Sequence, residues 1–368
     1  MNGAPNHLGA RDDFWRSRRV FLTGHTGFKG SWLSLWLHRM GAQVAGYSVD
    51  VPTTPSLYES ARVSETLTEE RGDVADGERL SDALARHQPE VVFHLAAQSL
   101  VRRSYADPAG TFRTNVLGTA HLLEAVRRAG EVRVVVNVTS DKCYRNNEWD
   151  WGYREEDQLG GADPYSASKA CAELVSAAYG RSFFSPGSGG PALASARAGN
   201  VIGGGDWSLD RLVPDAVRAA WAGEALVVRH PDAVRPWQHV IDCLDGYLLL
   251  AEQLWHDPGL AGPWNFGPDD ASTRSVAWMV ETVTGLLGSD HLGWRHEAAS
   301  DGHHEARHLR LDSSRARTLL GWKPKLQIDE AASLTASWYR AFREDGDARR
   351  TTLAQLDAHS ALEVGGPR

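Results

Sequence analysis

The stretch that decides the fold is RVFLTGHTGFKG, residues 19–30, in which a short apolar run is followed at once by a glycine-rich loop. Gly24, Gly27 and Gly30 are spaced as G-x-x-G-x-x-G, and residues 31–40 continue with the pattern of a helix. Glycine allows the backbone to turn tightly and to approach a pyrophosphate, which then lies at the positive end of the helix dipole. Strand, glycine loop and helix in this order predict a dinucleotide-binding βαβ unit.

Further apolar runs follow at 44–49, 90–95 and 132–138, and helical stretches such as 114–128 separate them. Such runs are typical of strands buried on both faces of a parallel sheet. The alternation predicts an α/β fold: a Rossmann-type doubly wound parallel sheet with a smaller mixed α/β lobe that binds substrate. We expect the chain to divide into a Rossmann domain at 18–200, with 236–262 returning to it, a lobe at 201–235 and 263–345, and tails at 1–17 and 346–368.

The composition restricts the class of partner. The 368 residues are 42% hydrophobic and carry a formal net charge of −8, which argues against general affinity for nucleic acid or for an anionic membrane surface. No apolar run approaches the roughly 20 residues that a membrane span needs, and the N-terminal stretch lacks an apolar signal core. The three cysteines fit neither a disulfide framework nor a zinc ribbon. We therefore expect a cytoplasmic protein with a small-molecule substrate.

Two carboxylates and a lysine extend the nucleotide site. Asp50 follows Gly30 at the end of the second strand, where a carboxylate binds ribose hydroxyls and favours NAD over NADP; alternatively it is a turn residue before Pro52. Asp73 could contact the adenine, or could cap a helix. Lys29, inside the glycine loop, could reach a phosphate or extend into solvent.

Tyr165 and Lys169 form Y-x-x-x-K, one helical turn apart on the same face. A neighbouring ammonium and a positive nicotinamide both stabilise phenolate, which predicts that the pKa of Tyr165 falls toward neutrality. The phenolate can then accept a hydroxyl proton while a hydride leaves the same carbon. The pair therefore indicates an alcohol oxidation that uses a nicotinamide cofactor.

Four segments together resemble the extended short-chain dehydrogenase/reductase family: GHTGFKG, HLAAQ (94–98), NVTSDK (137–142) and YSASK (165–169). The resemblance covers about residues 18–340. It implies NAD as cofactor, and a homodimer or a dimer of dimers joined through the helices near 115–128 and 165–169. The implied cofactor site is Gly24, Thr26, Gly27, Phe28, Lys29, Gly30, Asp50, Asp73, Leu95, Ala96, Ala97, Gln98, Tyr165 and Lys169.

The run Ser140-Asp141-Lys142 is similar to the Thr-Asp-Glu set of dTDP-glucose 4,6-dehydratases, whereas epimerases of the family usually carry an uncharged residue there. A lysine in the glutamate position, and the segments WGYRE (151–155), GNVIGGGDW (199–207) and PWQHV (236–240), resemble CDP-glucose 4,6-dehydratases. The resemblance implies a hydro-lyase that oxidises the C4 hydroxyl of the sugar, eliminates water across C5 and C6, and returns the hydride to C6.

The resemblance also implies a role for each residue. Ser140 orients the sugar ketone beside Tyr165, Asp141 is the candidate acid at C6 and must carry a proton, and Lys142 is the candidate base at C5 and must be a neutral amine. Alternatively, Lys142 acts only through its charge and another group takes the proton. The implied substrate-binding residues are Ser99, Ser140, Asn200, Arg211, Arg235 and His304.

Other readings remain open. Arg211 and Arg235 could form surface salt bridges, and the histidines of DGHHEARH (301–308) lack the spacing of a metal site, so no metal is expected. The substrate could be dTDP-glucose or GDP-mannose, and the reaction could be 4-epimerisation. A regulator that senses NAD without catalysis is a third class, which the intact Tyr165 and Lys169 disfavour.

Overall fold

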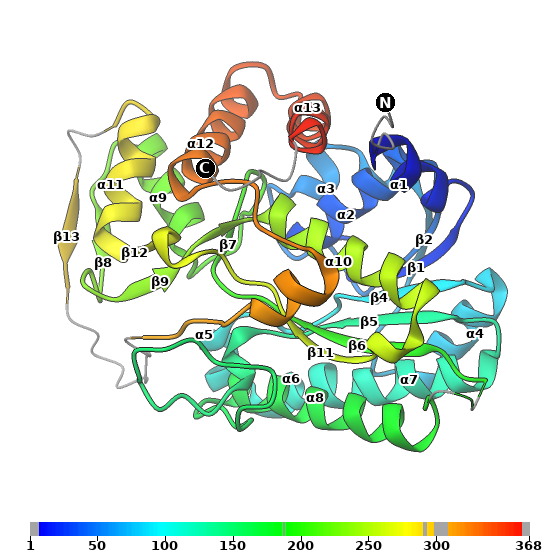
Figure 1. Cartoon of the computed structure of the whole chain (residues 1–368). Helices are drawn as coiled ribbons and strands as arrows, with labels where there is room; N and C mark the ends of the chain where they lie inside the picture. The colour runs from blue at the N-terminus through cyan, green and yellow to red at the C-terminus, as the bar shows by residue number, and fades with distance from the viewer. Residues whose placement is uncertain (1–6, 186, 188, 290–292, 298–307, 363–368) are drawn as a thin grey trace, which may run out of the picture.

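Seven parallel strands form the central sheet, in the order β11-β6-β5-β4-β1-β2-β3 (Figure 1). A computed structural model describes residues 7–185, 187, 189–289, 293–297 and 308–362. The strands of the sheet are β1 (Arg19–Thr23), β2 (Gln43–Ser48), β3 (Thr68–Arg71), β4 (Val91–His94), β5 (Val134–Val138), β6 (Ala192–Arg197) and β11 (Gly262–Asn265). The predicted doubly wound parallel sheet is confirmed.

Alternate side chains of each strand enter two separate cores, because successive residues of a strand point to opposite faces. In β1, Val20 and Leu22 join one core while Phe21 joins the other. Helices α2 (Phe28–Arg39) and α10 (Val240–His256) cover the first face. Helices α4 (Gly77–His87), α7 (Gly118–Ala129) and α8 (Pro164–Ser182) cover the second (Figure 1). The sheet is therefore buried on both faces, which explains its nearly continuous apolar runs.

The second half of the chain adds short two-stranded sheets beside helices α9, α11 and α12, at the left and top of Figure 1. Aromatic rings pack between the segment after β7 and these helices. The centroid of the Trp207 ring lies 5.2 Å from that of Tyr339 in α12 and 5.5 Å from that of Trp221 in α9. The elements are β7 (Val201–Ile202), α9 (Leu212–Ala222), β8 (Leu226–Val228), β9 (Val234–Pro236), β10 (Gln238–His239), β12 (Thr273–Ser275), α11 (Val276–Leu286), β13 (Trp294–His296) and α12 (Ile328–Asp345).

Residues 263–265, which the sequence assigned to the lobe, belong instead to the central sheet. As part of β11 they pair in parallel with β6, so that Trp264 lies opposite Ala196. The apolar run here is short and is interrupted by Pro263, which hides the strand from a periodicity argument.

The expected N-terminal tail is also wrong over the described residues. Helix α1 (His7–Trp15) packs against α10, and the Trp15 side chain is fully buried. The Trp15 indole nitrogen donates to Glu252 Oε1 at 2.6 Å, and Arg11 pairs with both Glu252 and Asp245. Charged groups made this segment look like a tail, but their partners lie more than 230 positions away in the chain.

At the other end, the expected tail forms helix α13 (Ala348–Ala361), which packs against α2 and α12. Ala348 and Leu356 are buried, and His359 Nε2 lies 2.8 Å from Asp242 Oδ1 in α10. Small and polar side chains dominate this helix, so it has no continuous apolar stripe that would predict its burial from the sequence. It is buried because α2 and α12 pack against it.

Short helical turns complete the description. They are α3 (Leu57–Ser60), η1 (Val63–Thr66), α5 (Val101–Ala106), α6 (Pro108–Phe112), η2 (Arg113–Leu117), η3 (Asp141–Cys143), η4 (Pro258–Leu260), η5 (Asp270–Ser272) and η7 (Ala316–Leu320). Among the described helices, none combines the length and the apolar character that crossing a membrane requires.

Candidate active site

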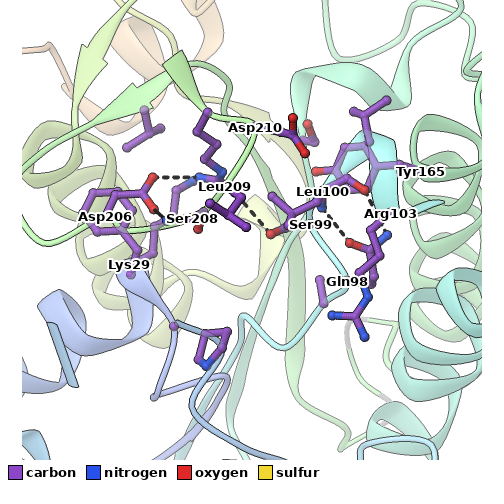
Figure 2. A pocket seen from close by; sticks show the side chains of 18 of the residues that line it. Lys29, Gln98, Ser99, Leu100, Arg103, Tyr165, Asp206, Ser208, Leu209 and Asp210 are labelled. Carbon is purple, nitrogen blue, oxygen red and sulfur yellow. Dashed lines mark hydrogen bonds and ion pairs between the residues drawn. The ribbon is translucent and has the colours of Figure 1, made fainter. Parts of the chain in front are cut away.

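A cleft of about 1120 Å³ opens beyond the carboxyl ends of the sheet strands, between the sheet and the second half of the chain. Figure 2 shows the 206–210 loop on one side of it, and the 98–103 segment with Tyr165 on the other. Every predicted site residue that the structure describes lines this cleft; His304 lies outside the described residues. Those residues are Gly24, Thr26, Gly27, Phe28, Lys29, Gly30, Asp50, Asp73, Leu95, Ala96, Ala97, Gln98, Ser99, Ser140, Asp141, Lys142, Tyr165, Lys169, Asn200, Arg211 and Arg235.

The glycine loop between β1 and α2 has no room for side chains at two of its three glycines. Gly24 has φ +78°, and a Cβ there would lie 2.7 Å from the backbone nitrogen of Ala96. A Cβ on Gly30 would lie 2.0 Å from the carbonyl oxygen of Gly24. Gly27 is the N-cap of α2 and has no side chain that could accept a hydrogen bond from the first amides of the helix. These amides therefore face the cleft without a side-chain cap. The loop therefore fits a dinucleotide pyrophosphate.

The two predicted carboxylates also line this end of the cleft. Asp50 is exposed after β2, and its backbone carbonyl accepts a hydrogen bond from Thr26 Oγ1 at 2.6 Å, which ties it to the glycine loop. Asp73 pairs with Arg113 at 3.0 Å and accepts from the Ala75 amide. The helix-cap alternative for Asp73 is wrong, because Asp76 caps α4.

Lys29 lines the cleft beside the glycine loop and also contacts α10. Its ammonium donates to the Tyr247 hydroxyl at 3.3 Å and lies 5.6 Å from the centre of that ring. Tyr247 belongs to α10 and is fully buried. Lys29 thus points from the cofactor loop toward α10, and it lies 218 positions from Tyr247 in the chain.

Asn115 organises the middle of the site and was missed by the sequence argument. Its Nδ2 donates to Ser168 Oγ at 2.8 Å and to the Gln98 carbonyl at 3.0 Å, while its Oδ1 accepts from the Gln98 amide. It lies in the π-helical turn η2, a distortion frequent at functional sites. Arg113 and Thr114 beside it are also polar, so no local sequence signal distinguished it.

Tyr165 and Lys169 stand on the first turns of α8, which Asp163 caps through the Ser166 amide. Both are buried, and the Lys169 ammonium donates to the Val138 carbonyl at 3.2 Å. Burial, and then the positive charge of Lys29, lower the pKa of Lys169 to about 8.

The predicted fall in the pKa of Tyr165 is wrong for the chain's own groups. Burial is the main cause that raises the pKa of this phenol to about 12; a hydrogen bond with Ser140 opposes the rise and the charge of Asp141 adds to it. Desolvation outweighs the neighbouring charges because the phenolate loses its water here. Positive charge from a bound ligand is therefore needed to ionise it.

The Ser140–Lys142 run forms the turn η3, directly after β5. Ser140 Oγ donates to Asp141 Oδ1 at 2.9 Å and accepts from the Lys142 amide at 3.2 Å. Asn200 donates to the other oxygen of Asp141 at 3.5 Å, and a Cβ on Gly199 would lie 1.8 Å from it. Asp141 is therefore buried and held from two strands.

On the opposite side, Arg211 bridges two segments. It donates to Asp206 Oδ2 at 3.2 Å and to Ser99 Oγ at 3.1 Å. Asp210, at φ +59°, lies within 4 Å of two more arginines, Arg102 at 3.7 Å and Arg229 at 3.9 Å. Asp206 and Asp210 were missed: Asp206 meets Arg211 only five positions away, which was a usable signal, whereas the arginines near Asp210 are distant in the chain.

Arg235 stands on β9, whose antiparallel partner β12 places Arg274 opposite it. Its side chain is largely buried at the cleft wall, and its NH1 donates to the Val234 carbonyl at 3.0 Å. Arg235 is therefore not a surface side chain. Over the described part of the chain, no group of three or more His, Cys, Asp or Glu side chains is placed to hold a metal ion.

Comparison with known proteins identifies the family. A family model described as GDP-mannose 4,6 dehydratase matches residues 21–335. The chain belongs to this family. A CDP-glucose 4,6-dehydratase of Salmonella typhimurium is 48% identical to it over 334 residues, which cover 90% of this chain and 92% of that protein.

Solved structures agree with this membership of the GDP-mannose 4,6 dehydratase family. A dTDP-glucose 4,6-dehydratase of Streptomyces venezuelae, crystallised with NAD, is 26% identical with a TM-score of 0.75, over 88% of this chain and 98% of that one. An epimerase of Methanothermobacter thermautotrophicus, at 22% identity, reaches a TM-score of 0.80 over 93% and 98% of the two chains, and supports the fold alone.

For a member of the GDP-mannose 4,6 dehydratase family, the cleft holds two chemically distinct groups side by side. Tyr165 and Lys169 come from α8 and can move a proton during oxidation. Ser140, Asp141 and Lys142 come from the turn after β5 and include a carboxyl and an amine. The second group adds what an elimination needs, an acid and a base, to what an oxidation needs.

Proposed function

We propose that this protein catalyses the NAD-dependent dehydration of CDP-D-glucose to CDP-4-dehydro-6-deoxy-D-glucose. The observation that carries the proposal is the placement of Asp141, buried and bonded to Ser140, in the same cleft wall as Tyr165. The 48% identity to a CDP-glucose 4,6-dehydratase supports the choice of nucleotide.

In the proposed first step, Tyr165 accepts the proton of the sugar C4 hydroxyl, and Ser140 orients the resulting ketone oxygen. Lys169, anchored by the Val138 carbonyl, holds positive charge at this end of α8. NAD held by the glycine loop would supply the hydride acceptor for C4, the hydride donor for C6 and a ring charge that favours the phenolate.

In the proposed second step, the ketone acidifies the C5 proton, which Lys142 removes. Asp141 protonates the C6 hydroxyl as the bond between C6 and oxygen breaks, so that water leaves. When C6 regains the hydride, the Lys142 ammonium returns a proton to C5, which completes the 4-dehydro-6-deoxy sugar. For the diphosphate we propose Arg235 and Arg211, because a guanidinium fork matches phosphate oxygens. Asn200, Ser99 and His304 complete the proposed substrate contacts.

The test is a competition among CDP-glucose, dTDP-glucose, UDP-glucose, UDP-galactose and GDP-mannose, incubated together with the protein and NAD. We expect CDP-glucose to be consumed first and to give a product lighter by one water, measured by mass spectrometry. Interconversion of UDP-galactose and UDP-glucose without loss of water would instead show an epimerase. Bound NAD with no consumption of any sugar would show a binding protein without catalysis.

We further propose that the protein is a cytoplasmic homodimer, or a dimer of dimers. Large apolar side chains are exposed on the adjoining elements α6, η2 and α8, where solvent exposure without a partner is unfavourable. Phe112 is 37% exposed, Leu117 43% and Leu174 59%. Light scattering of the wild type and a Leu174→Glu variant tests this, and a wild type with the mass of a monomer would contradict it.

A further inference from the structure

We propose that a buried ion pair, Arg197–Glu173, positions the Ser140–Lys142 turn relative to α8, and that elimination depends on this more than oxidation does. The inference rests on the proposed dehydratase function. Neither residue lines the cleft. Both are positioning residues, because they act through the turn.

The pair has a fixed two-point geometry. Arg197 Nε donates to Glu173 Oε1 at 2.9 Å and NH2 donates to Oε2 at 2.9 Å, with both side chains less than 5% exposed. Parallel bonds of this kind fix the angle between two groups as well as their distance. Replacing such a pair by apolar side chains is often neutral for stability, so stability alone does not explain it.

The pair reaches both ends of the turn. At the start, Thr139 Oγ1 donates to Glu173 Oε1 at 2.5 Å. At the end, Arg197 NH1 donates to the Tyr144 hydroxyl at 2.7 Å, and that hydroxyl donates to Asn265 Oδ1 at 2.7 Å. Burial raises the pKa of the Tyr144 phenol, so it stays protonated and makes both bonds. The candidate acid and base lie between these two anchors.

The pair is also continuous with the other catalytic elements. Glu173 follows Tyr165 and Lys169 at intervals of four residues, on the same face of α8. Arg197 ends β6, and the chain continues to Gly199 and Asn200, which contact Asp141. One ion pair thus links α8, which carries the oxidation, to the turn that carries the elimination.

The arrangement predicts different sensitivities for the two half-reactions. Oxidation at C4 relies on proton transfer by Tyr165 beside Lys169, both on α8, and the turn contributes only Ser140, which orients the oxygen. Elimination needs Asp141 and Lys142 to meet C6 and C5 of a sugar held against that helix, so it depends on the distance between turn and helix. Loss of one anchor should therefore slow elimination and leave oxidation nearly unchanged.

The test uses the full-length variants Thr139→Val and Tyr144→Phe, each of which removes one hydroxyl and leaves the ion pair in place. Tyr153→Phe is the matched control, because Tyr153 stacks on Tyr144 at 5.1 Å but its hydroxyl bonds to Asn146 and Asn147. CDP-6-deoxyglucose lacks the leaving hydroxyl, so it reports C4 oxidation alone through the absorbance of reduced nicotinamide.

We expect both variants to oxidise CDP-6-deoxyglucose at rates within about twofold of the wild type, while turnover of CDP-glucose falls about tenfold to hundredfold. Reduced nicotinamide should then accumulate during turnover of CDP-glucose, which simple loosening of the fold does not produce. Tyr153→Phe should resemble the wild type in both measurements.

Equal loss of both half-reactions in the two variants, or turnover of CDP-glucose within twofold of the wild type, would overturn the inference. A wild type that turns over none of the sugar nucleotides would instead overturn the proposed function. Because Thr139 and Tyr144 anchor opposite ends of the turn, agreement between the two variants excludes a local folding defect.

Discussion

The two walls of the cleft differ in how their charges are held. On the wall formed by α8 and the turn after β5, Tyr165, Lys169 and Asp141 are all less than 9% exposed. On the wall formed by the 206–211 loop, the side chains of Arg211 and Asp210 are 33% and 41% exposed. Arg211 bonds to Ser99 and Asp210 lies near Arg102, so both reach the opposite side of the opening. The buried wall is set before any ligand arrives, whereas the exposed wall has carboxylates where a diphosphate would bind.

This difference has a physical consequence. Charges in a buried environment interact strongly and respond to pH, whereas exposed pairs are weakened by salt and exchange partners easily. We therefore expect changes on the buried wall to affect kcat and its pH dependence, and changes on the exposed wall to affect KM and its salt dependence. Five experiments test this division.

Tyr165→Phe should have the largest effect. It keeps the ring and removes the hydroxyl that accepts the C4 proton, so kcat should fall by about 10²- to 10⁴-fold. Steady-state rates with CDP-glucose measure this, and NAD binding should be retained. A kcat within tenfold of the wild type would mean that another group on this wall accepts the proton.

Gly30→Ala should come next. Its Cβ would lie 2.0 Å from the Gly24 carbonyl oxygen, so the loop must open, at a cost of about 1–3 kcal/mol or more. We expect a lower melting temperature and NAD affinity reduced at least tenfold. Gly180→Ala, in helix α8 with no atom within 4 Å of the added Cβ, is the matched control and should leave NAD affinity unchanged.

The pH dependence should follow Lys169, whose ammonium is lost as pH rises through about 8. We expect kcat/KM to fall above that pH, by about tenfold one unit higher. The unfolded lysine keeps its proton up to about 10.5, so between these pH values this group makes the fold more stable as pH rises. The loss is therefore not unfolding, which a thermal melt at each pH checks; Lys169→Arg should abolish the fall.

Arg235→Lys should raise KM for CDP-glucose by about tenfold with little change in kcat, because an ammonium cannot bind two phosphate oxygens as the fork does. Arg274→Lys, the cross-strand neighbour outside the cleft lining, is the matched control and should be silent. A fall in kcat without a change in KM would contradict a role of Arg235 in binding the diphosphate.

Asp210→Asn should have the smallest effect, and in the opposite direction. Its carboxylate lies near Arg102 and Arg229, so removing its charge should release attraction to the diphosphate and lower KM by about 1.5- to 5-fold. The gain should vanish at high salt. Asp13→Asn, far from the cleft, controls for net charge; an unchanged KM at low salt would contradict a competing role for Asp210.

The cofactor half of the site could be predicted because its information is local. Gly24, Gly27 and Gly30 lie between one strand and one helix, and Tyr165 and Lys169 lie on one helix, so spacing alone brings each set together. The same holds for the sheet, whose strands appear as apolar runs. Spacing also placed Asp141 and Lys142 at the end of β5, where the sheet opens.

What spacing cannot provide is the partner of a charge. Whether Lys29 meets a phosphate, water or Tyr247 depends on α10, and whether residues 1–17 and 346–368 are tails depends on Glu252 and Asp242 in the same helix. The pKa of Tyr165 was predicted in the wrong direction for the same reason: neighbours are visible in the sequence, but burial is not.

Residues 19–30 and the Y-x-x-x-K pair were thus enough to predict a nucleotide-binding sheet and the residues that would carry out an oxidation. The tertiary structure alone decided how the turn after β5 is held against α8, since Thr139 and Tyr144 flank the turn while Glu173 and Arg197 come from α8 and β6. Backbone geometry follows local sequence, whereas the strength of a charge depends on what surrounds it after folding.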